Sequence, residues 1–173
     1  MSAILALALS AALTMPLPPS TAALGKHEGV CRPNEPGPAV LLAITGFKDR
    51  SGLLRAELYP AVDGDFLADD NVLLSQGKTF ARVDIPVPAS GPVELCIRVP
   101  RPGRYALSLL HDRNGNLKFD LSVDGIGFPG NPKLGWSKPG ADKAAFQAGP
   151  GLTPLSIRLN YLRGWGMRPL EDR

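Results

Sequence analysis

The sequence has little of what enzymes use for catalysis. It contains two histidines in 173 residues, and it lacks a Gly-x-Ser-x-Gly elbow, a His-Glu-x-x-His zinc motif, a P-loop and a dinucleotide-binding fingerprint. His27 lies in a segment rich in Gly and Pro, which leaves His111 as the one candidate for acid or base chemistry. These absences favour a protein that is not an enzyme.

Long runs of one charge are also missing. The chain has 19 Lys and Arg residues against 16 Asp and Glu residues, so its formal net charge is only +3, and the basic residues are scattered along it. A nucleic-acid-binding domain typically concentrates basic residues and places aromatic residues between them. We therefore expect no nucleic-acid partner.

No apolar run is long enough to cross a membrane as a helix, which needs about 20 residues. The run from Ile4 to Leu13 is shorter and lies within 23 residues that carry no charged side chain. Prolines and the small residues 20–23 follow it. This pattern predicts a secretory signal peptide over residues 1–23, and hence an exported protein, periplasmic or extracellular, with no transmembrane segment in the mature chain.

Cysteine is scarce, and the two residues present suggest one crosslink. From Val93 to Val99 the apolar residues occupy odd positions, so Cys96 faces outward on a strand. The Gly/Pro-rich segment around Cys31 could lie across that face. Export favours an oxidised Cys31–Cys96 pair, which would close a loop of about 65 residues; two free thiols are the alternative.

The sequence does contain many short β-strand patterns separated by turn signals. Alternating or apolar segments predict strands at 39–47, 54–58, 81–87, 93–99, 104–112 and 155–161. The first two should form a hairpin. A short helical turn is expected within 63–74, and a turn or a seventh strand within 142–146. Residues 117–140 contain turn signals and no expected strand.

These patterns predict an all-β fold, an antiparallel β-sandwich of about seven strands that is immunoglobulin-like or transthyretin-like, with a long Gly/Pro-rich loop. The expected organisation is a signal peptide (1–23), an N-terminal tether (24–38), the sandwich domain (39–162) and a polar C-terminal tail (163–173).

The densest group of polar side chains is His111 to Asp120, where the strand 104–112 ends. Oxygen ligands at every second residue resemble the spacing of a calcium loop. The predicted ligands are Asp112, Asn114, Asn116, Asp120 and the backbone carbonyl of Lys118. Leu117 stands where that loop has glycine, and Asp124 could replace the missing twelfth ligand. The alternative is an Asx-turn loop that needs no metal.

His111 continues the alternation of the strand's apolar face, so it should cap the core at one end of the sandwich. The candidates for ligand binding in and after this loop are His111, Asp112, Asn114, Asn116, Asp120, Asp124, Phe128 and Trp136. The two aromatic residues would form an exposed patch if the loop binds a partner.

Three stretches together resemble a known family. Pro102 to Ala106 is followed by His-Asp-x-Asn-x-Asn at 111–116 with Asp120, and then by Gly-Ile-Gly-Phe-Pro at 125–129. This series resembles the domain-of-unknown-function 2141 family over about residues 39–162. The resemblance implies an exported bacterial protein of uncharacterised activity. The Pro-Gly-x-Tyr turn is also similar to that of transthyretin-like and carboxypeptidase-regulatory sandwich modules, which concerns the fold alone.

We therefore expect an exported, non-catalytic module with a binding or structural role, no cofactor and an unidentified ligand. Two alternatives stay open. One is a hydrolase or sugar-active enzyme that uses the carboxylates Asp112, Asp120 and Asp124 beside His111. The other is a calcium-stabilised adhesion or matrix module.

Overall fold

Short β-strands form most of the molecule. The computed structural model describes residues 16–170, so the first 15 residues of the predicted signal peptide lie outside the described part. The strands are β1 (Ala39–Thr45), β2 (Leu53–Pro60), β3 (Ala81–Pro86), β4 (Val93–Arg98), β5 (Gly103–Asp112), β6 (Gly125–Gly127), β7 (Ala145–Ala148), β8 (Leu152–Arg158), β9 (Asn160–Leu162) and β10 (Met167–Pro169). A helix, α1 (Asp70–Ser75), and a 3-10 turn, η1 (Ala141–Ala144), complete the elements.

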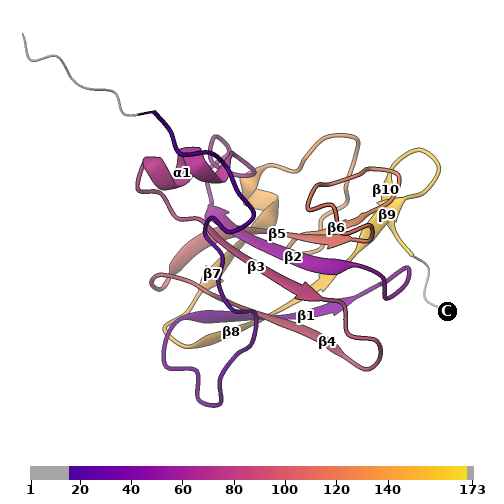
Figure 1. Ribbon diagram of the computed structural model, residues 1–173. Helices are drawn as coiled ribbons and strands as arrows, with labels where there is room; N and C mark the ends of the chain where they lie inside the picture. Colours follow the sequence, from indigo (N-terminus) through magenta and orange to yellow (C-terminus); the bar gives the residue numbers. More distant parts are fainter. Residues whose placement is uncertain (1–15, 171–173) are drawn as a thin grey trace, which may run out of the picture.

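The strands form two sheets that face each other (Figure 1). The smaller sheet has the order β4-β1-β8, with β1 antiparallel to β4 and parallel to β8. The larger sheet has the order β10-β9-β6-β5-β2-β3. Strand β5 is long enough for its first part to pair with β7 and its last part with β6. The predicted β-sandwich is confirmed.

The first two strands do not form the expected hairpin. Strand β1 lies in the smaller sheet and β2 in the larger one, and the connection 46–52 passes between them. Gly46 and Gly52 both have positive φ angles, 77° and 74°, and a Cβ at Gly52 would lie 2.0 Å from the Asp112 carbonyl oxygen. Because both strands present an apolar face to the same core, each can supply one wall of it.

Two apolar clusters stabilise the molecule. The first fills the space between the sheets with the inward-facing residues of β1, β2, β4 and β5. The second covers the outer face of the larger sheet and includes Tyr59, Phe66, Leu73 and Phe128. Phe66 contacts both Tyr59 and Phe128 edge to face, with ring centroids 5.6 and 6.0 Å apart. Phe128 is only 2% exposed, so its predicted role in an exposed aromatic patch was wrong.

Within the expected N-terminal tether, residues 24–31 form an ordered strap. Lys26 forms a parallel bridge with Arg82 on β3, and the Gly29 carbonyl accepts a hydrogen bond from the Cys96 amide at 2.9 Å. The strap therefore crosses from the edge strand β3 of one sheet to the edge strand β4 of the other, as the indigo chain in Figure 1 shows. Covering edge strands protects their unpaired backbone groups.

A disulfide anchors the end of the strap. Cys31 and Cys96 are bonded at an S–S distance of 2.02 Å, which confirms the predicted pair. Cys96 faces outward on β4, between the inward-facing Leu95 and Ile97, as the alternation predicts. Crosslinking residues so far apart in sequence reduces the conformational freedom of the unfolded chain.

Two strands lie where the sequence predicted none. Strand β6 lies in the long loop 117–140, where it pairs with β5. Strand β10 lies in the segment 163–173, which was expected to be a polar tail, and it pairs with β9. Strand β6 contains two glycines because a Cβ at Gly125 would lie 2.5 Å from the Tyr161 ring, and one at Gly127 would lie 2.4 Å from the Ile157 side chain. Because glycine is uncommon in strands, the sequence pattern did not predict β6.

The short helices match the expected positions. Helix α1 falls within 63–74 except for its last residue, and η1 leads directly into β7, so both alternatives expected for 142–146 are present. No helix among residues 16–170 is long and apolar enough to span a membrane.

Candidate functional site

His111 lies at the end of the sandwich and is completely buried. Its Nδ1 is 2.7 Å from the Tyr161 hydroxyl on β9, and its Nε2 is 2.8 Å from the Ser51 carbonyl oxygen in the β1–β2 connection. Phe47 packs edge to face against the imidazole with ring centroids 5.3 Å apart. The histidine therefore joins β5 to both neighbouring segments and caps the core.

The hydrogen bonds assign the imidazole tautomer. A carbonyl oxygen can only accept, so Nε2 of His111 carries the proton and donates to Ser51. Nδ1 then accepts from the Tyr161 hydroxyl, which itself accepts a hydrogen bond from the Lys48 amide at 3.2 Å. Burial lowers the pKa of His111 below its ordinary value and raises the pKa of Tyr161 to about 12. The neutral forms of both groups match this network.

Asp112 organises the loop that follows β5. It is completely buried, and its Oδ1 accepts hydrogen bonds from the amides of Gly115 at 2.8 Å and Asn116 at 3.2 Å. Its Oδ2 accepts one from the Leu117 amide at 2.7 Å. Leu117 has a φ of 66°, an angle that side-chain-bearing residues rarely adopt. Three backbone amides donate charge-assisted hydrogen bonds to this one carboxylate and hold the chain in the tight turn.

The side chains of Asn114, Asn116 and Asp120 bond within the loop itself. The side-chain carbonyl of Asn114 accepts a bond from the Asn116 amide, and that of Asn116 accepts one from the Lys118 amide, which are Asx turns. The Nδ2 groups of both asparagines donate to Oδ2 of Asp120 at 2.8 and 2.6 Å. The loop is thus closed by its own side chains.

Asp124 closes the far end of the loop. It is buried, and its two oxygens accept bonds from the amides of Arg113 at 2.9 Å and Asp120 at 2.8 Å. The Arg113 guanidinium pairs with Asp49, donates to the Val123 carbonyl and holds the pKa of Asp49 at about 2. The loop is therefore fixed to the β1–β2 connection as well as to itself.

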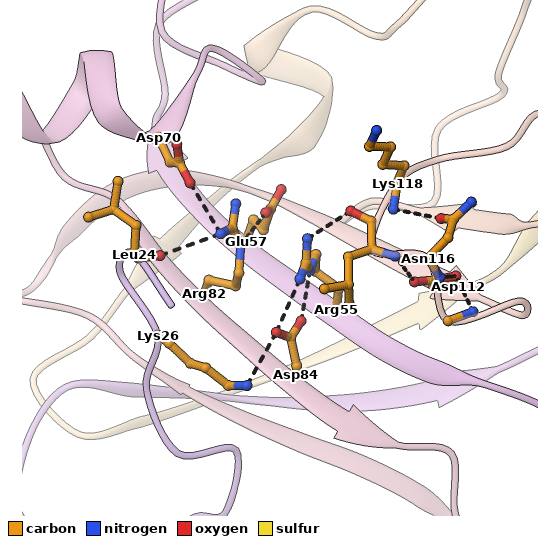
Figure 2. A network of polar contacts seen from close by, with 12 residues as sticks. Leu24, Lys26, Arg55, Glu57, Asp70, Arg82, Asp84, Asp112, Asn116 and Lys118 are labelled. Carbon is orange, nitrogen blue, oxygen red and sulfur yellow. Dashed lines mark hydrogen bonds and ion pairs between the residues drawn. The ribbon is translucent and has the colours of Figure 1, made fainter. Parts of the chain in front are cut away.

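A buried ion pair fixes the loop to the outer face of the larger sheet (Figure 2). Arg55 on β2 donates to the Leu117 carbonyl at 3.0 Å and pairs with Asp84 on β3, with Nε and Oδ1 2.7 Å apart. Asp84 also lies 3.6 Å from Lys26 of the strap. The chain of contacts from Lys26 to Asp112 joins the strap to the loop.

A second arginine holds the strap and α1 on the same face. Arg82 on β3 is paired with Glu57 at 2.7 Å and with Asp70 of α1 at 3.1 Å, and it lies within hydrogen-bond distance of the Leu24 carbonyl (Figure 2). Because its guanidinium is largely buried, the two carboxylates compensate for the loss of solvation. Both arginine clusters are structural.

The oxygen atoms of the loop do not fit a calcium site as they stand. Calcium takes six to eight oxygen ligands at about 2.3–2.6 Å. Asp112 directs both oxygens to backbone amides, and the asparagines present N–H groups to Asp120. Among residues 16–170, the one group of His, Cys, Asp or Glu close enough to share a metal is Cys31, Glu35 and Cys96, whose sulfurs are bonded to each other. This geometry matches the Asx-turn alternative, and calcium binding stays a prediction.

Nor do the loop carboxylates surround a substrate-sized space with His111. Asp112 and Asp124 are buried and engaged with amides, while Asp120 is half-buried and accepts two side-chain bonds. None of these four residues lines any of the three pockets described for residues 16–170.

The two larger pockets lie elsewhere and are basic. One, of about 930 Å³, lies beside the β1–β2 and β3–β4 connections and is lined by Lys48, Asp49, Arg50, Arg158 and Arg163 among others. The second, of about 760 Å³, lies between the loop 131–134 and the β9–β10 hairpin, and its charged lining residues are Lys133, Arg158, Arg163 and Arg168. Arg158 and Arg163 line both pockets, so the pockets adjoin at these two residues, and the two together are called the basic groove below.

Both tryptophans of the chain are exposed and lie in loops that border this groove. Trp136 follows the loop 131–134 and is 66% exposed, as expected for a binding candidate. Trp165, in the turn between β9 and β10, is 86% exposed and was missed from the sequence. Each tryptophan directly follows a glycine, at positions 135 and 164, and this local turn signal could have marked both as surface residues.

Comparison with known proteins identifies the family and nothing closer. Neither the curated proteins nor the solved structures contain a match to the chain. The family model described as "Uncharacterized protein conserved in bacteria (DUF2141)" matches residues 42–155, which include β2 to β7 and the Asp112 loop, residues 112–124. A match over more than half of the chain shows membership. The protein belongs to the DUF2141 family of bacterial proteins.

Proposed function

We propose that this protein is an exported, non-catalytic β-sandwich module that acts in the bacterial cell envelope or outside the cell, where it binds a ligand through the loops at one end of the sandwich. The proposal rests on the burial and hydrogen bonding of the residues that could perform catalysis. His111, Asp112 and Asp124 are buried and engaged in hydrogen bonds that hold the fold, while the basic groove and both tryptophans face solvent.

The disulfide supports export. Disulfides persist in oxidising compartments such as the periplasm and the extracellular space and are rare in the cytoplasm. Cys31, one of the two bonded cysteines, also lies shortly after the segment predicted to be a signal peptide. Cleavage near Ala23 would leave the strap, residues 24–31, intact at the start of the mature protein.

Export can be tested directly. The full chain, expressed with its own N-terminal residues in a Gram-negative host, should be recovered in the periplasm with Leu24 or a near neighbour as its first residue. Mass spectrometry should find the mature chain lighter by two hydrogens than its reduced form. Cytoplasmic retention of a chain that keeps residues 1–23, or two free thiols in the recovered protein, would contradict the proposal.

The non-catalytic role needs a separate test. The purified protein should not turn over chromogenic glycosides or esters. Turnover that is lost in an Asp120→Asn variant but kept in an Asp142→Asn variant would replace the binding proposal with the hydrolase alternative. Asp142 is a suitable control because it is exposed and lies on η1, outside the Asp112 loop.

A further inference from the structure

We propose that a small pocket in the segment between β6 and β7 binds a phosphoryl group, either as free phosphate or as a phosphate monoester. The pocket has a volume of about 280 Å³, and all its lining residues lie between positions 133 and 143. It is a third pocket, which shares Lys133 and Leu134 with the basic groove. The inference goes beyond the proposed function, which does not depend on it.

The lining of this pocket is basic. No carboxylate is among its described lining residues, and three lysines line it: Lys133, Lys138 and Lys143. Two carboxylates lie nearby in the chain or in space. Asp142 is paired with Arg104 at 2.7 Å, and Asp63 accepts a hydrogen bond from the Ala141 amide at 2.6 Å. Three ammonium groups therefore outnumber the carboxylates that could compensate for them, and such an excess attracts anions.

The loop that carries the lysines is fixed at several points. The Lys138 ammonium donates to the Phe66 carbonyl at 3.0 Å, and Leu134 packs against the second apolar cluster. The bond from the Ala141 amide to Asp63 holds the end of the loop. An ammonium group has three donors, so Lys138 keeps two for a ligand. Because the pocket is already formed, a ligand has less conformational entropy to offset on binding.

The size and the donors of the pocket favour a phosphoryl group. A volume of about 280 Å³ is just below the range of about 300–1,000 Å³ that is usual for sites of drug-sized ligands, so a compact anion fits it. A phosphoryl group carries a charge of about −1.5 to −2 at neutral pH and three strong acceptor oxygens. Three lysines can supply one donor to each oxygen, and the Ser137 hydroxyl adds a fourth. A carboxylate has one charge and two oxygens and would use this set less fully.

Trp136 favours a phosphate that is attached to a ring. The residues on either side of it, Gly135 and Ser137, both line the pocket, and the Trp136 side chain is 66% exposed. An indole offers a large, flat apolar surface on which the ring of a ligand can pack. We therefore expect a sugar phosphate to bind more tightly than phosphate alone.

Fluorescence can test the inference on the exported, disulfide-bonded protein. The chain has two tryptophans, so a Trp165→Phe variant leaves Trp136 as the single reporter beside the pocket. Inorganic phosphate, titrated at constant ionic strength, should change the emission, and glucose 6-phosphate should do so at lower concentration. Glucose should leave it unchanged. Tighter binding of glucose 6-phosphate would assign the pocket to a monoester, and tighter binding of phosphate would assign it to the free anion.

Variants locate the site, with calorimetry as a second measure of affinity. Lys133→Gln/Lys143→Gln should bind glucose 6-phosphate about tenfold more weakly, whereas Lys133→Arg/Lys143→Arg should keep most of the affinity. The matched control Lys48→Gln/Lys118→Gln removes the same charge outside this pocket and should stay within about twofold of the parent protein. All four lysines are exposed, so these variants should fold, which thermal melts can verify.

Several results would overturn the inference. These are no response to either phosphate compound, equal binding of glucose and glucose 6-phosphate, an equal response to sodium chloride, or equal affinity of the two Gln double variants. A protein that fails these tests but is exported with its disulfide loses the phosphoryl assignment and keeps the proposed export.

Discussion

The Asp112 loop, residues 112–124, and the basic groove contain polar residues of similar chemistry, but they use them in opposite ways. In the loop, Asp112 and Asp124 accept five backbone hydrogen bonds between them, and each has both oxygens engaged. In the groove, the Leu170 carbonyl accepts a hydrogen bond from the Arg158 guanidinium and the Pro169 carbonyl accepts one from Arg163, so that basic side chains line the pockets. A dense stretch of polar residues can thus stabilise the conformation of a loop. Charged residues that are scattered in the sequence can be brought together by the fold to line a pocket.

The largest effect should come from removing the loop's central carboxylate. Asp112→Ala should lower the free energy of unfolding by about 3 kcal/mol, because bonds to a charged acceptor contribute about 1.5–3 kcal/mol each and some of the three amides can rebond to water. Urea denaturation measures the change. Asp112→Asn, which keeps one carbonyl oxygen, should lose less, and Asp142→Ala should be nearly neutral. A loss as small as that of Asp142→Ala would show that the loop does not depend on Asp112.

A pH titration of stability should reveal the burial of His111. Because its pKa is lowered in the folded state, the unfolded chain binds the proton more readily. Stability is therefore fully present above the unfolded pKa of about 6.5 and is lost as the pH falls from there toward the folded pKa. Thermal melts between neutral and mildly acidic pH should show this slope. The slope should disappear in His111→Gln and persist in His27→Gln; its persistence in His111→Gln would assign it to another group.

The groove should behave differently from the loop when its charges are removed. Lys133→Gln/Arg168→Gln should change the free energy of unfolding by less than about 0.5 kcal/mol, as is usual for exposed side chains. If it instead unfolded as readily as Asp112→Ala, the groove residues would be structural, and the contrast between the two regions would not hold.

The smallest effect is expected from a chelator. Since amide and side-chain N–H groups already occupy the loop oxygens, EDTA should leave the melting temperature of the pure protein unchanged, and added calcium should not raise it. Scanning calorimetry with and without calcium measures this. A clear rise with calcium, lost in Asp120→Asn, would show that the loop rearranges around an ion and would favour the calcium-stabilised alternative.

Local patterns predicted much of the fold. The alternation of apolar residues placed Cys96 outward and His111 on the core face, and both positions follow from the two-residue period of a strand. Pairing was harder to predict. The predicted hairpin of β1 and β2 was wrong because strands that are neighbours in sequence need not be neighbours in a sheet. Strand β6 was not predicted because it contains two glycines, which leave room for the side chains of Tyr161 and Ile157.

In the candidate sites too, local features were predicted from the sequence and features that depend on distant residues were not. Asp and Asn at alternate positions predicted an oxygen-rich turn, and the Asx-turn alternative named its geometry correctly. Phe128 could not be recognised as a core residue, because its partners Phe66 and Tyr59 come from a loop and strand far away in the sequence. Trp165 was assigned to a polar tail and so was not considered for binding.

By itself, the sequence determined which faces of the strands are apolar, and it favoured the Cys31–Cys96 pair and an oxygen-rich turn after β5. These depend on residues that are close in sequence or have no alternative partner. Only the tertiary structure decided which strands pair and where the charges gather. Lys48, Lys133 and Arg168 are more than thirty residues apart in sequence. They line two adjoining pockets because the β1–β2 connection, the loop after β6 and the β9–β10 hairpin lie close together.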